Sequence, residues 1–436
     1  MAAIKTFRGY RYKLESHEEL SFYTSPPYDM IDAAMVEKLY EKHPLNTVRI
    51  IQNKPEAVDR ENRTRHERAA KILDSWIKEG ILIRDSEDCV YVYNQNFVID
   101  SEGRKCQKER TGVVVLVKLT GFEEKVVFPH EYTLSGPKQD RYELLETTRT
   151  NTGQVFGLVS DRGDIYEIIK RMKNESTLCG SFTDETGVCH SLYRCSDGEL
   201  GEQLKKAVEP RSILIADGHH RYETALRFYR DKGNEQYSHM MMTLVSTADP
   251  GLVIRPFHRL IKMGSEGKQV VMKEALGEFF HCTDMGEARP ESINGSLICE
   301  QGKGSIIYMD KSSRTLSSLR LNETGEKYLK SVMPEHTDLW KHLGVSIINA
   351  VVIKGILGLN PDGHVLHDRI DYVNTVEGGV EMLDKANDYY GGFFIEPVSI
   401  DTVNAVVEGG ERMPQKSTNF FPKLFSGLVF NRMDPK

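Results

Sequence analysis

The chain alternates between short apolar runs and longer segments in which apolar residues recur at helical spacing. The short runs predict strands at residues 81–84, 90–93, 113–119, 125–128, 154–160, 213–216, 237–245, 252–261, 305–309 and 392–395. The spaced segments predict helices at residues 32–42, 63–79, 137–148, 164–172, 200–208, 268–280 and 377–388, and one directly after Gly218. Because strands and helices are interleaved along the chain, we expect an α+β (mixed α/β) protein.

Turn-forming residues between apolar runs predict two hairpins and the start of one helix. One hairpin joins residues 81–84 to 90–93 through the polar turn 85–88. The other covers residues 180–195, with its turn at residues 184–187. The turn Ser135-Gly136-Pro137 precedes the helix that ends near Thr148.

The length of the chain predicts more than one domain. A chain of 436 residues is expected to fold as about two or three domains. We expect an N-terminal α/β region at residues 1–122, a central catalytic core at residues 123–263, and a C-terminal α/β region at residues 264–436.

Composition and charge narrow the class of protein. The net charge is −7 and there is no long basic run, which disfavours nucleic acid as a partner. No apolar segment reaches the length of a membrane span, and the N-terminus lacks the apolar region of a signal peptide. The seven cysteines form no C-x-x-C pair, so neither a zinc ribbon nor a redox dithiol is indicated. We expect a cytoplasmic, reduced protein that binds no membrane.

The most informative motif is the corner where the apolar run 213–216 meets the helical pattern after Gly218. Asp217, Gly218, His219, His220 and Arg221 lie at this corner. The N–H groups and the dipole of a helix N-terminus favour an anion, and arginine and imidazole groups add further donors. The corner therefore predicts a phosphate-binding site. A metal site and a purely structural role remain alternatives, although adjacent histidines on one helical turn point in different directions.

A second group of polar residues follows the apolar run 125–128. Glu131 lies just beyond its end, and Lys138 and Arg141 lie on the next predicted helix. A carboxylate there can accept a proton from a hydroxyl nucleophile, while the cations stabilise negative charge. The alternative is that Glu131 caps or pairs locally and that Lys138, Asp140 and Arg141 form a solvated helix face.

Other candidates are weaker. Asp29 or Asp32 is expected to cap the helix at residues 32–42. Arg49, and the pair His258-Arg259, are further candidate anion contacts.

Residues 410–418 have the glycine, lysine and serine of a P-loop at the right spacing. Gln415 replaces the second glycine, Pro414 interrupts the loop, and no helix is predicted to follow. Because a P-loop needs glycine for its backbone N–H groups to surround the phosphates, we reject a Walker site. Four polar residues of this region remain candidates for a lid over an active site, namely Lys416, Ser417, Thr418 and Lys423.

Taken together, five motifs resemble a prokaryotic family long catalogued as a domain of unknown function. They are Pro26-Pro27-Tyr28-Asp29, His130-Glu131-x-Thr133, Lys138-x-Asp140-Arg141, the segment 216–221, and Met413-Pro414-x-Lys416-Ser417-Thr418. The resemblance covers nearly the whole chain. It implies a ParB/sulfiredoxin-like central domain, and for some members it implies an ATP-dependent free L-serine kinase. Smaller free serine kinases of this fold use ADP and share the Asp-Gly-His-His-Arg corner and a catalytic glutamate.

The relatives of this fold differ in chemistry at the corner. Sulfiredoxins carry a nucleophilic cysteine where this chain has His219, so reduction of a sulfinic acid is excluded. ParB proteins carry Gly-Glu-Arg-Arg at the corner and a helix-turn-helix segment for DNA, and we find no such segment here.

The resemblance implies the following roles. Glu131 acts as general base toward the serine hydroxyl, and residues 217–221 hold the transferred phosphoryl group or nucleotide. Mg²⁺ accompanies ATP, or ADP, with Asp217 as a candidate contact. Candidate contacts to substrate or phosphate are Asp29, Arg49, His130, Lys138, Arg141, Lys416, Ser417 and Thr418.

Two alternatives to the kinase remain open. One is a ParB-like regulatory protein that binds or hydrolyses a nucleotide without phosphorylating serine. The other is a hydrolase or transferase that acts on another phosphorylated metabolite. The oligomeric state is left open.

Overall fold

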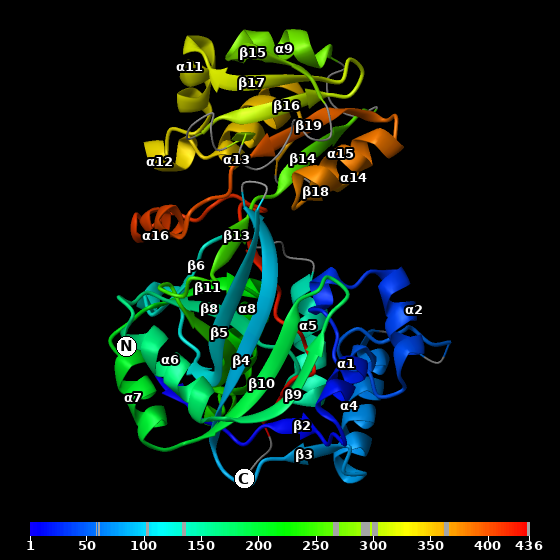
Figure 1. The fold of residues 1–436 in the computed structure, drawn as a ribbon, viewed down its shortest axis with the longest axis vertical. Coiled ribbons are helices and arrows are strands. Elements are labelled where there is room, and N and C mark those ends of the chain that lie inside the picture. The colour runs from blue at the N-terminus through cyan, green and yellow to red at the C-terminus, as the bar shows by residue number, and fades with distance from the viewer. Residues whose placement is uncertain are drawn as a thin grey trace. The chain divides into compact units, whose positions relative to one another are not determined.

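The computed structural model describes residues 1–57, 59, 62–101, 104–132, 137–264, 270–288, 297–298, 304–361 and 366–433. The chain forms two compact units (Figure 1). The first unit comprises Met1–Ile99, Gln107–Val253 and Pro422–Lys436, and the second comprises Asp100–Cys106 and Ile254–Phe421. Strands and helices occur in both units, so the expected mixed α/β class is confirmed. The division at residues 122 and 263 stays a prediction.

The first unit is built around one large mixed sheet. Its strand order is β6-β11-β8-β12-β5-β4-β10-β9, and β1 pairs with β5. The strands are β1 (Ile4–Lys5), β4 (Cys89–Ser101), β5 (Arg104–Lys118), β6 (Val127–Pro129), β8 (Val155–Val159), β9 (Thr177–Thr183), β10 (Cys189–Ser196), β11 (Ile213–Asp217) and β12 (His239–Ser246). β11 runs parallel to β6 and antiparallel to β8, while β12 runs parallel to β8. The end of β11 therefore lies at the same edge as the end of β6 and the starts of β8 and β12.

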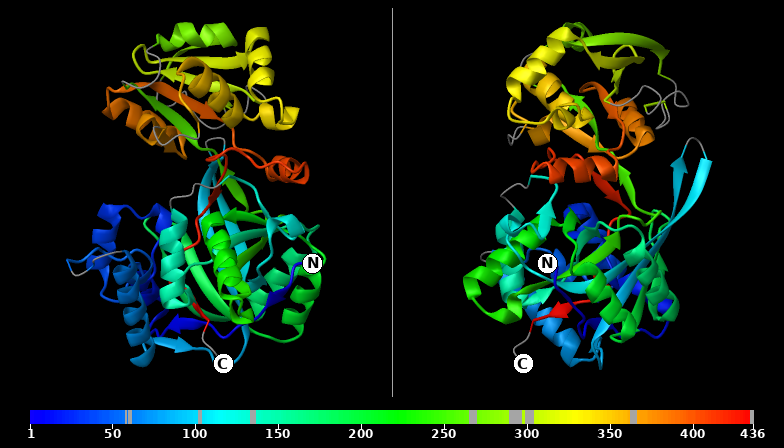
Figure 2. Two further views of the ribbon diagram at one scale, coloured as in Figure 1. Left: turned by 180° about the vertical axis from the view of Figure 1, so that it is seen from behind. Right: turned by 90° about the vertical axis from the view of Figure 1, so that its left-hand side faces the viewer.

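Four helices contribute to the core of this unit: α5 (Pro137–Thr148), α6 (Asp164–Glu175), α7 (Glu199–Val208) and α8 (His219–Lys232). In α6, the buried residues Ile165, Ile169 and Met172 recur at the spacing of one helix face, as the sequence pattern indicates. Their side chains join the core formed by the strand residues. α5 and α8 pack side by side (Figure 1 and Figure 2).

The predicted hairpin over residues 81–93 is wrong, whereas the hairpin over residues 180–195 is confirmed. β3 (Leu82–Arg84) pairs with β2 (Tyr10–Tyr12) instead of β4. Asp85, in the expected turn, accepts hydrogen bonds from Arg11 Nε (2.8 Å) and Tyr91 Oη (2.6 Å). β4 pairs with β10, which in turn pairs with β9. The backbone N–H and C=O groups of β3 therefore bond to β2, which is distant in sequence, and not to β4 as the local pattern predicts.

The expected strand at residues 252–261 is interrupted. It forms β13 (Val253–Arg255) and β14 (His258–Lys262). Pro256 lies at the break, and because proline has no N–H it cannot donate in a sheet. β13 pairs with β20 (Asn419–Phe421), the strand that follows the rejected P-loop.

The second unit contains a six-stranded sheet in the order β15-β17-β16-β19-β14-β18. The strands not yet given are β15 (Phe280–Glu287), β16 (Ile306–Asp310), β17 (Thr315–Leu321), β18 (Ile370–Val373) and β19 (Tyr389–Ile395). Its helices include α9 (Met272–Phe279), α11 (Glu323–Val332), α15 (Val376–Lys385), α16 (Ile400–Glu408) and the π-helical segment Ile348–Ile356. β15, β17 and α11 have no counterpart in the sequence-based prediction.

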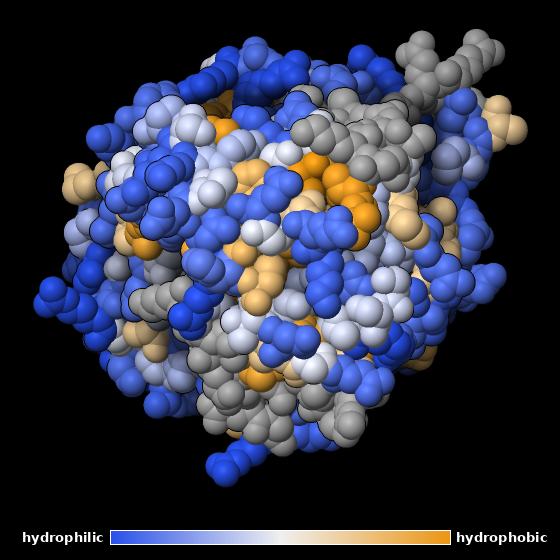
Figure 3. Space-filling model, turned by 90° about the horizontal axis from the view of Figure 1, so that it is seen from above, coloured by the Kyte–Doolittle hydropathy of each residue, from blue (hydrophilic) through white to orange (hydrophobic). Residues whose placement is uncertain are grey.

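The face seen in Figure 3 is mostly hydrophilic, with small separate hydrophobic areas. None of the described helices has the length and apolar character needed to cross a membrane. The six cysteines within the described residues are free thiols, and Cys299 lies outside those residues. Thr133 and the turn residues Ser135 and Gly136 also lie outside them.

In the N-terminal part of the first unit, α2 (Ala33–Lys42), α3 (Val48–Ile51) and α4 (Asn62–Lys78) lie along the chain between β1 and β4 of the large sheet. Asp32 caps α2 by accepting a hydrogen bond from Met35 N at 2.8 Å, so Asp32 and not Asp29 is the cap.

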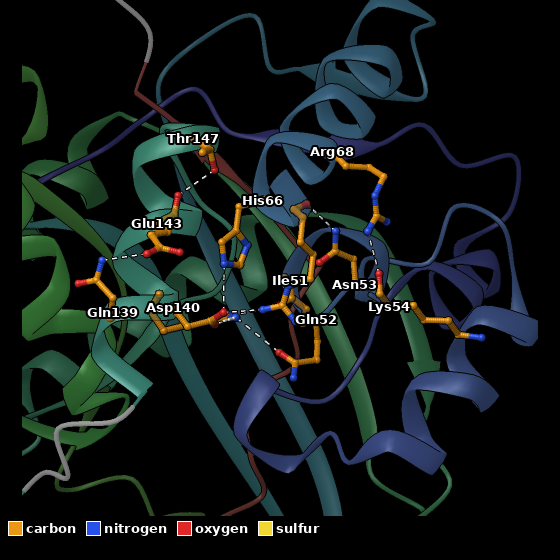
Figure 4. Close-up of polar contacts among 12 residues, drawn as sticks. Ile51, Gln52, Asn53, Lys54, His66, Arg68, Gln139, Asp140, Glu143 and Thr147 are labelled. Atoms are coloured by element: carbon orange, nitrogen blue, oxygen red, sulfur yellow. Dashed lines mark hydrogen bonds and ion pairs between the residues drawn. The ribbon is translucent and has the colours of Figure 1, made fainter. Parts of the chain in front are cut away.

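Asp140 ties α4 to α5 through a cluster of cations. Its carboxylate lies 3.0 Å from His66 Nε2, accepts from Arg141 Nε at 2.9 Å, and pairs with Arg65 (Figure 4). Burial raises the pKa of this carboxyl, but His66 and Arg141 outweigh that effect and hold its pKa well below the usual range. Asp140 is therefore ionised in the folded protein at neutral pH.

We expect Asp140→Asn to lower the stability of the first unit by about 2 kcal/mol at pH 7, because it removes the negative charge that pairs with Arg65 and Arg141 and contacts His66. That corresponds to a fall in Tm of roughly 4–8 °C, measured by thermal unfolding. Because the folded pKa is lowered, the contribution is present above the ordinary aspartate value of about 4 and is lost as pH falls below it. The gap between wild type and variant should therefore close in acid.

The matched control is Asp74→Asn on α4, whose carboxylate is 60% exposed and pairs with Arg432. An exposed ion pair contributes little, so this variant should melt close to wild type at every pH. Equal shifts in the two variants would show that the Asp140 cluster does not stabilise the packing of α4 and α5.

Candidate active site

Three turns of the chain converge at one edge of the large sheet. His130 and Glu131 follow the end of β6, the segment 217–221 follows β11, and Gly153 and Gln154 precede β8. Arg221 on α8 donates to the carbonyl oxygen of Gln154, which links two of these turns. The parallel pairing of β6 and β11 links the third. Residues that are distant in sequence are thereby placed around one corner.

Gly218 shapes this corner. It has φ 90° and ψ 29°, a left-handed conformation, and it caps the N-terminus of α8. A Cβ atom at this position would lie 2.8 Å from an Arg221 guanidinium nitrogen. Glycine therefore lets the backbone turn and lets Arg221 lie close against it. The first N–H groups of α8 have no acceptor within the helix, which makes the corner favourable for an anion.

Asp217 holds two cations at the corner. Its Oδ1 lies 3.4 Å from Lys423 Nζ, and its Oδ2 accepts from Arg221 at 3.3 Å. Burial raises the pKa of Asp217, but Lys423, Arg221 and His219 lower it to about 2. The carboxylate is therefore charged at neutral pH, and it neutralises one of the two cations.

Lys423 is held in place by buried polar contacts along the C-terminal segment. Gln95 Nε2 donates to the carbonyl oxygen of Lys423 at 2.9 Å, and Arg110 donates to that of Pro422. Arg110 is only 1% exposed, and burial lowers its pKa to about 10. The sequence predicts Lys423 only as a candidate lid residue, because nothing in the local sequence indicates a contact with Asp217.

His219 connects the corner to the loop that carries Glu131. Its Nε2 accepts a hydrogen bond from the backbone N–H of His130 at 3.4 Å, and the two imidazole rings lie 4.8 Å apart. Burial, and then the proximity of His130, lowers the pKa of His219 to about 3. The ring is therefore neutral, with its proton on Nδ1. His219 acts as an acceptor here and not as the donor expected from the sequence.

His130 bridges β11 and Glu131. Its Nδ1 lies 2.6 Å from the carbonyl oxygen of Ile215, which can only accept, so Nδ1 carries a proton. Its Nε2 lies 3.3 Å from Glu131 Oε1. His130 thus connects the end of β11 to the carboxylate of Glu131.

The other predicted residues differ in how they relate to the corner. Lys138 pairs with Glu223 on α8 at 2.5 Å. Arg141 lies over the Tyr28 ring at 4.3 Å, and Arg221 lies 6.0 Å from the same ring. Figure 4 shows the carbonyl of Ile51, to which Arg141 donates at 2.8 Å, beside the Asp140 cluster. His220 lies half-buried on the first turn of α8.

Within the part of the chain that the structure describes, no hydrogen bond or ion pair joins Asp29 or Arg49 to the corner. Asp29 is exposed, and its neighbour Tyr28 is the residue whose ring lies near both Arg141 and Arg221. Arg49 donates to the carbonyl of Tyr40 at 3.0 Å and lies 4.1 Å over the ring of that residue.

Lys416, Ser417 and Thr418 belong to the second unit. There, Arg259 donates to the carbonyl oxygen of Lys416 at 3.1 Å, and Ser417 donates to that of Pro414. Their role as a lid stays a prediction.

A pocket opens beside Arg221, between α5 and α8. It is lined by Tyr28, Ile51, Arg141, Leu144, Leu145, Thr150, Asn151, Thr152, Gly153, Arg221, Thr224, Met240 and Ser426. The sequence motifs did not predict this pocket. Thr224 lies three residues after Arg221 and therefore on the same face of α8, and this spacing is the one sequence feature that links Thr224 to the corner. Asn151 and Ser426 carry no comparable signal.

Within the described residues, no three His, Cys, Asp or Glu side chains are grouped closely enough to hold a metal ion.

Comparison with known proteins identifies the family. The model of the family described as "Protein of unknown function (DUF1015)" matches residues 4–346, and the chain belongs to this family. No curated protein matches the chain.

Several solved structures resemble the chain at low identity. A free serine kinase in complex with AMP is 12% identical, with a TM-score of 0.35 over 71% of this chain and 86% of that one. A conserved hypothetical protein from Pyrococcus furiosus is 12% identical, with a TM-score of 0.34 over 72% and 93%. SbnI with a C-terminal truncation, from Staphylococcus aureus, is 13% identical, with a TM-score of 0.34 over 72% and 85%.

We expect Gly218→Ala to destabilise the first unit by more than the strain of its left-handed backbone, because the new methyl group also displaces Arg221. The matched control is Gly233→Ala at the other end of α8, where φ is 60° and nothing lies within 4 Å of the added atom. The control should cost about 1 kcal/mol from backbone strain alone. Thermal unfolding of both variants measures the difference. Equal falls in Tm would contradict a tight packing of Arg221 on Gly218.

Proposed function

We propose that the protein is a small-molecule kinase that transfers a phosphoryl group from a nucleotide, ATP or ADP, to the hydroxyl of free L-serine. The observation that carries the proposal is the corner itself, where a helix N-terminus, Arg221 and Lys423 face the loop that bears Glu131. The ParB/sulfiredoxin-like character of the central core and the choice of serine as acceptor rest on the motif resemblance. Serine as the acceptor is therefore tested directly, by assay of its phosphorylated product.

Phosphoryl transfer depends mainly on positioning and on stabilisation of charge, and the corner supplies both without a P-loop. The first N–H groups of α8 and the guanidinium of Arg221 bind phosphate oxygens. Lys423 adds a second cation. Asp217 keeps both side chains oriented through its contacts of 3.4 and 3.3 Å. We assign residues 217–221, together with Lys423, to phosphate binding.

Glu131 accepts the proton of the serine hydroxyl as the oxygen attacks the phosphorus atom. His130 positions this carboxylate, because its Nε2 lies 3.3 Å from Glu131 Oε1. The neutral ring of His219 orients this loop by accepting from the backbone of His130. The O–H bond of serine breaks, a P–O bond forms, and the nucleotide leaves with one phosphoryl group fewer.

Asp217 does not suit a protein-held Mg²⁺. Each of its carboxylate oxygens already lies 3.3–3.4 Å from a cationic nitrogen, which opposes a second positive charge. Mg²⁺ is therefore expected to arrive with the nucleotide, bound to its phosphates, and no residue is assigned to it.

The direct test is incubation of the full-length protein with L-serine, Mg²⁺ and either ATP or ADP, with detection of O-phospho-L-serine by mass spectrometry. We expect product with one of the two donors. Absence of product with both would overturn the proposed function. Nucleotide hydrolysis that does not depend on serine would favour a ParB-like regulatory protein instead.

We expect Glu131→Gln to lower kcat by at least about 100-fold, because the amide cannot accept the hydroxyl proton. Its affinity for nucleotide should stay within about twofold of wild type, measured by isothermal titration. The control is Glu143→Gln on α5. The carboxylate of Glu143 accepts a hydrogen bond from Gln139, and this variant should keep full activity. Normal turnover in Glu131→Gln would remove the role assigned to this residue.

A further inference from the structure

The pocket between α5 and α8 is lined by both apolar and polar side chains. The apolar ones are Ile51, Leu144, Leu145 and Met240. The polar ones include Tyr28, Arg141, Asn151, Arg221, Thr224 and Ser426. Its cavity volume is about 50 Å³, a few times the roughly 10–15 Å³ that one water molecule requires. This space suits a group of a few atoms and is too small for a nucleobase.

Two polar groups on residues that line the pocket lack hydrogen-bond partners among the described residues. Thr224 is 4% exposed, and its Oγ1 has no hydrogen-bond partner among the described residues. The same holds for Nε of Arg221, whose side chain is 11% exposed. Buried polar atoms are nearly always paired in folded proteins, so two unpaired donors lining one pocket indicate a missing ligand with acceptor atoms.

The charges around the pocket favour an anion. Arg141 and Arg221 both line the pocket and lie 4.3 and 6.0 Å from the Tyr28 ring. Asp140 offsets part of the charge of Arg141, and Asp217 offsets part of that of Arg221. A carboxylate has two oxygens for the two unpaired donors, Arg221 Nε and Thr224 Oγ1. The donors of the corner are already assigned to the phosphate oxygens, so the pocket is left for a different anionic group.

We propose that this pocket is the subsite for the carboxylate of the small acceptor molecule, an amino or hydroxy acid. The proposal rests on the proposed function, since it concerns the acceptor of the same reaction. Arg221 joins the two sites: its terminal nitrogens contact Asp217 and the carbonyl of Gln154, and its side chain also lines the pocket. Binding of the carboxylate thus orients the acceptor against the residue that also contacts the transferred phosphate.

The test is Thr224→Val, which replaces the unpaired hydroxyl by a methyl group of similar shape. Thr243→Val is the matched control, because its Oγ1 on β12 is equally buried and unpartnered but does not line the pocket. Neither variant loses a hydrogen bond within the protein, so both should melt at or above the wild-type temperature. Thr224→Ser, which keeps the hydroxyl, serves as the conservative variant.

Isothermal titration measures binding of L-serine, L-threonine and D-glycerate to each full-length variant without nucleotide. We expect Thr224→Val to weaken binding of the acids roughly tenfold or more, as loss of a hydrogen bond to a charged group does. Thr243→Val and Thr224→Ser should bind within about twofold of wild type. L-serinamide, which lacks the carboxylate, should bind wild type at least roughly tenfold more weakly than L-serine.

The outcomes separate this proposal from the proposed function. Phosphoserine formation with an unchanged KM for serine in Thr224→Val would overturn the subsite but leave the kinase in place. A raised KM for the nucleotide in that variant, or equal binding of serine and serinamide, would also overturn the subsite. Binding of an acid that is lost in Thr224→Val, with no product from any donor, would support the subsite and overturn the kinase. Absence of binding by all three acids would overturn the subsite.

Discussion

The buried carboxylate of Asp217 is the interaction on which the arrangement of the corner depends. It ends the strand β11 and contacts one cation from α8 and one from the C-terminal segment. Bringing Arg221 and Lys423 together without a counter-charge would cost repulsion in a poorly solvated place. With the carboxylate between them, two cations can lie beside a helix N-terminus and still leave one positive charge uncompensated. That residual charge is what a phosphate would neutralise.

The corner also fixes the loop that carries Glu131, by a contact that needs an uncharged histidine. His219 can accept from the backbone of His130 only while its Nε2 carries no proton, and burial ensures this by lowering its pKa to about 3. A charged imidazole at this position would lose the contact and would add to the repulsion with Arg221 and Lys423. The His-His pair of the motif therefore does not simply supply positive charge. One of its members serves as a fixed acceptor that positions the neighbouring loop.

Local sequence was sufficient to predict the corner, because a strand followed by glycine and a helix is encoded within about ten residues. The motif resemblance implied that Glu131 lies beside this corner, and the parallel pairing of β6 with β11 brings its loop there. What could not be predicted depends on distant partners. β3 pairs with β2 and not with β4, and Lys423 reaches Asp217 across 206 residues of sequence. The local sequence gives Tyr28 no role beyond its motif, since its place near the guanidinium groups of Arg141 and Arg221 depends on the packing of α5 and α8.

Under the proposed function, the polar groups at this sheet edge would let a site without a glycine-rich P-loop bind two different anions. Backbone donors at a helix start and two cations suit a phosphate, which presents several oxygens in a compact group. The pocket beside them is lined by two residues with unpaired donors and by apolar side chains, which suits a flat carboxylate. Arg221 belongs to both environments, and Gly218 determines where its guanidinium can lie. The conformation of a single glycine would thus set the distance between the two proposed anion sites.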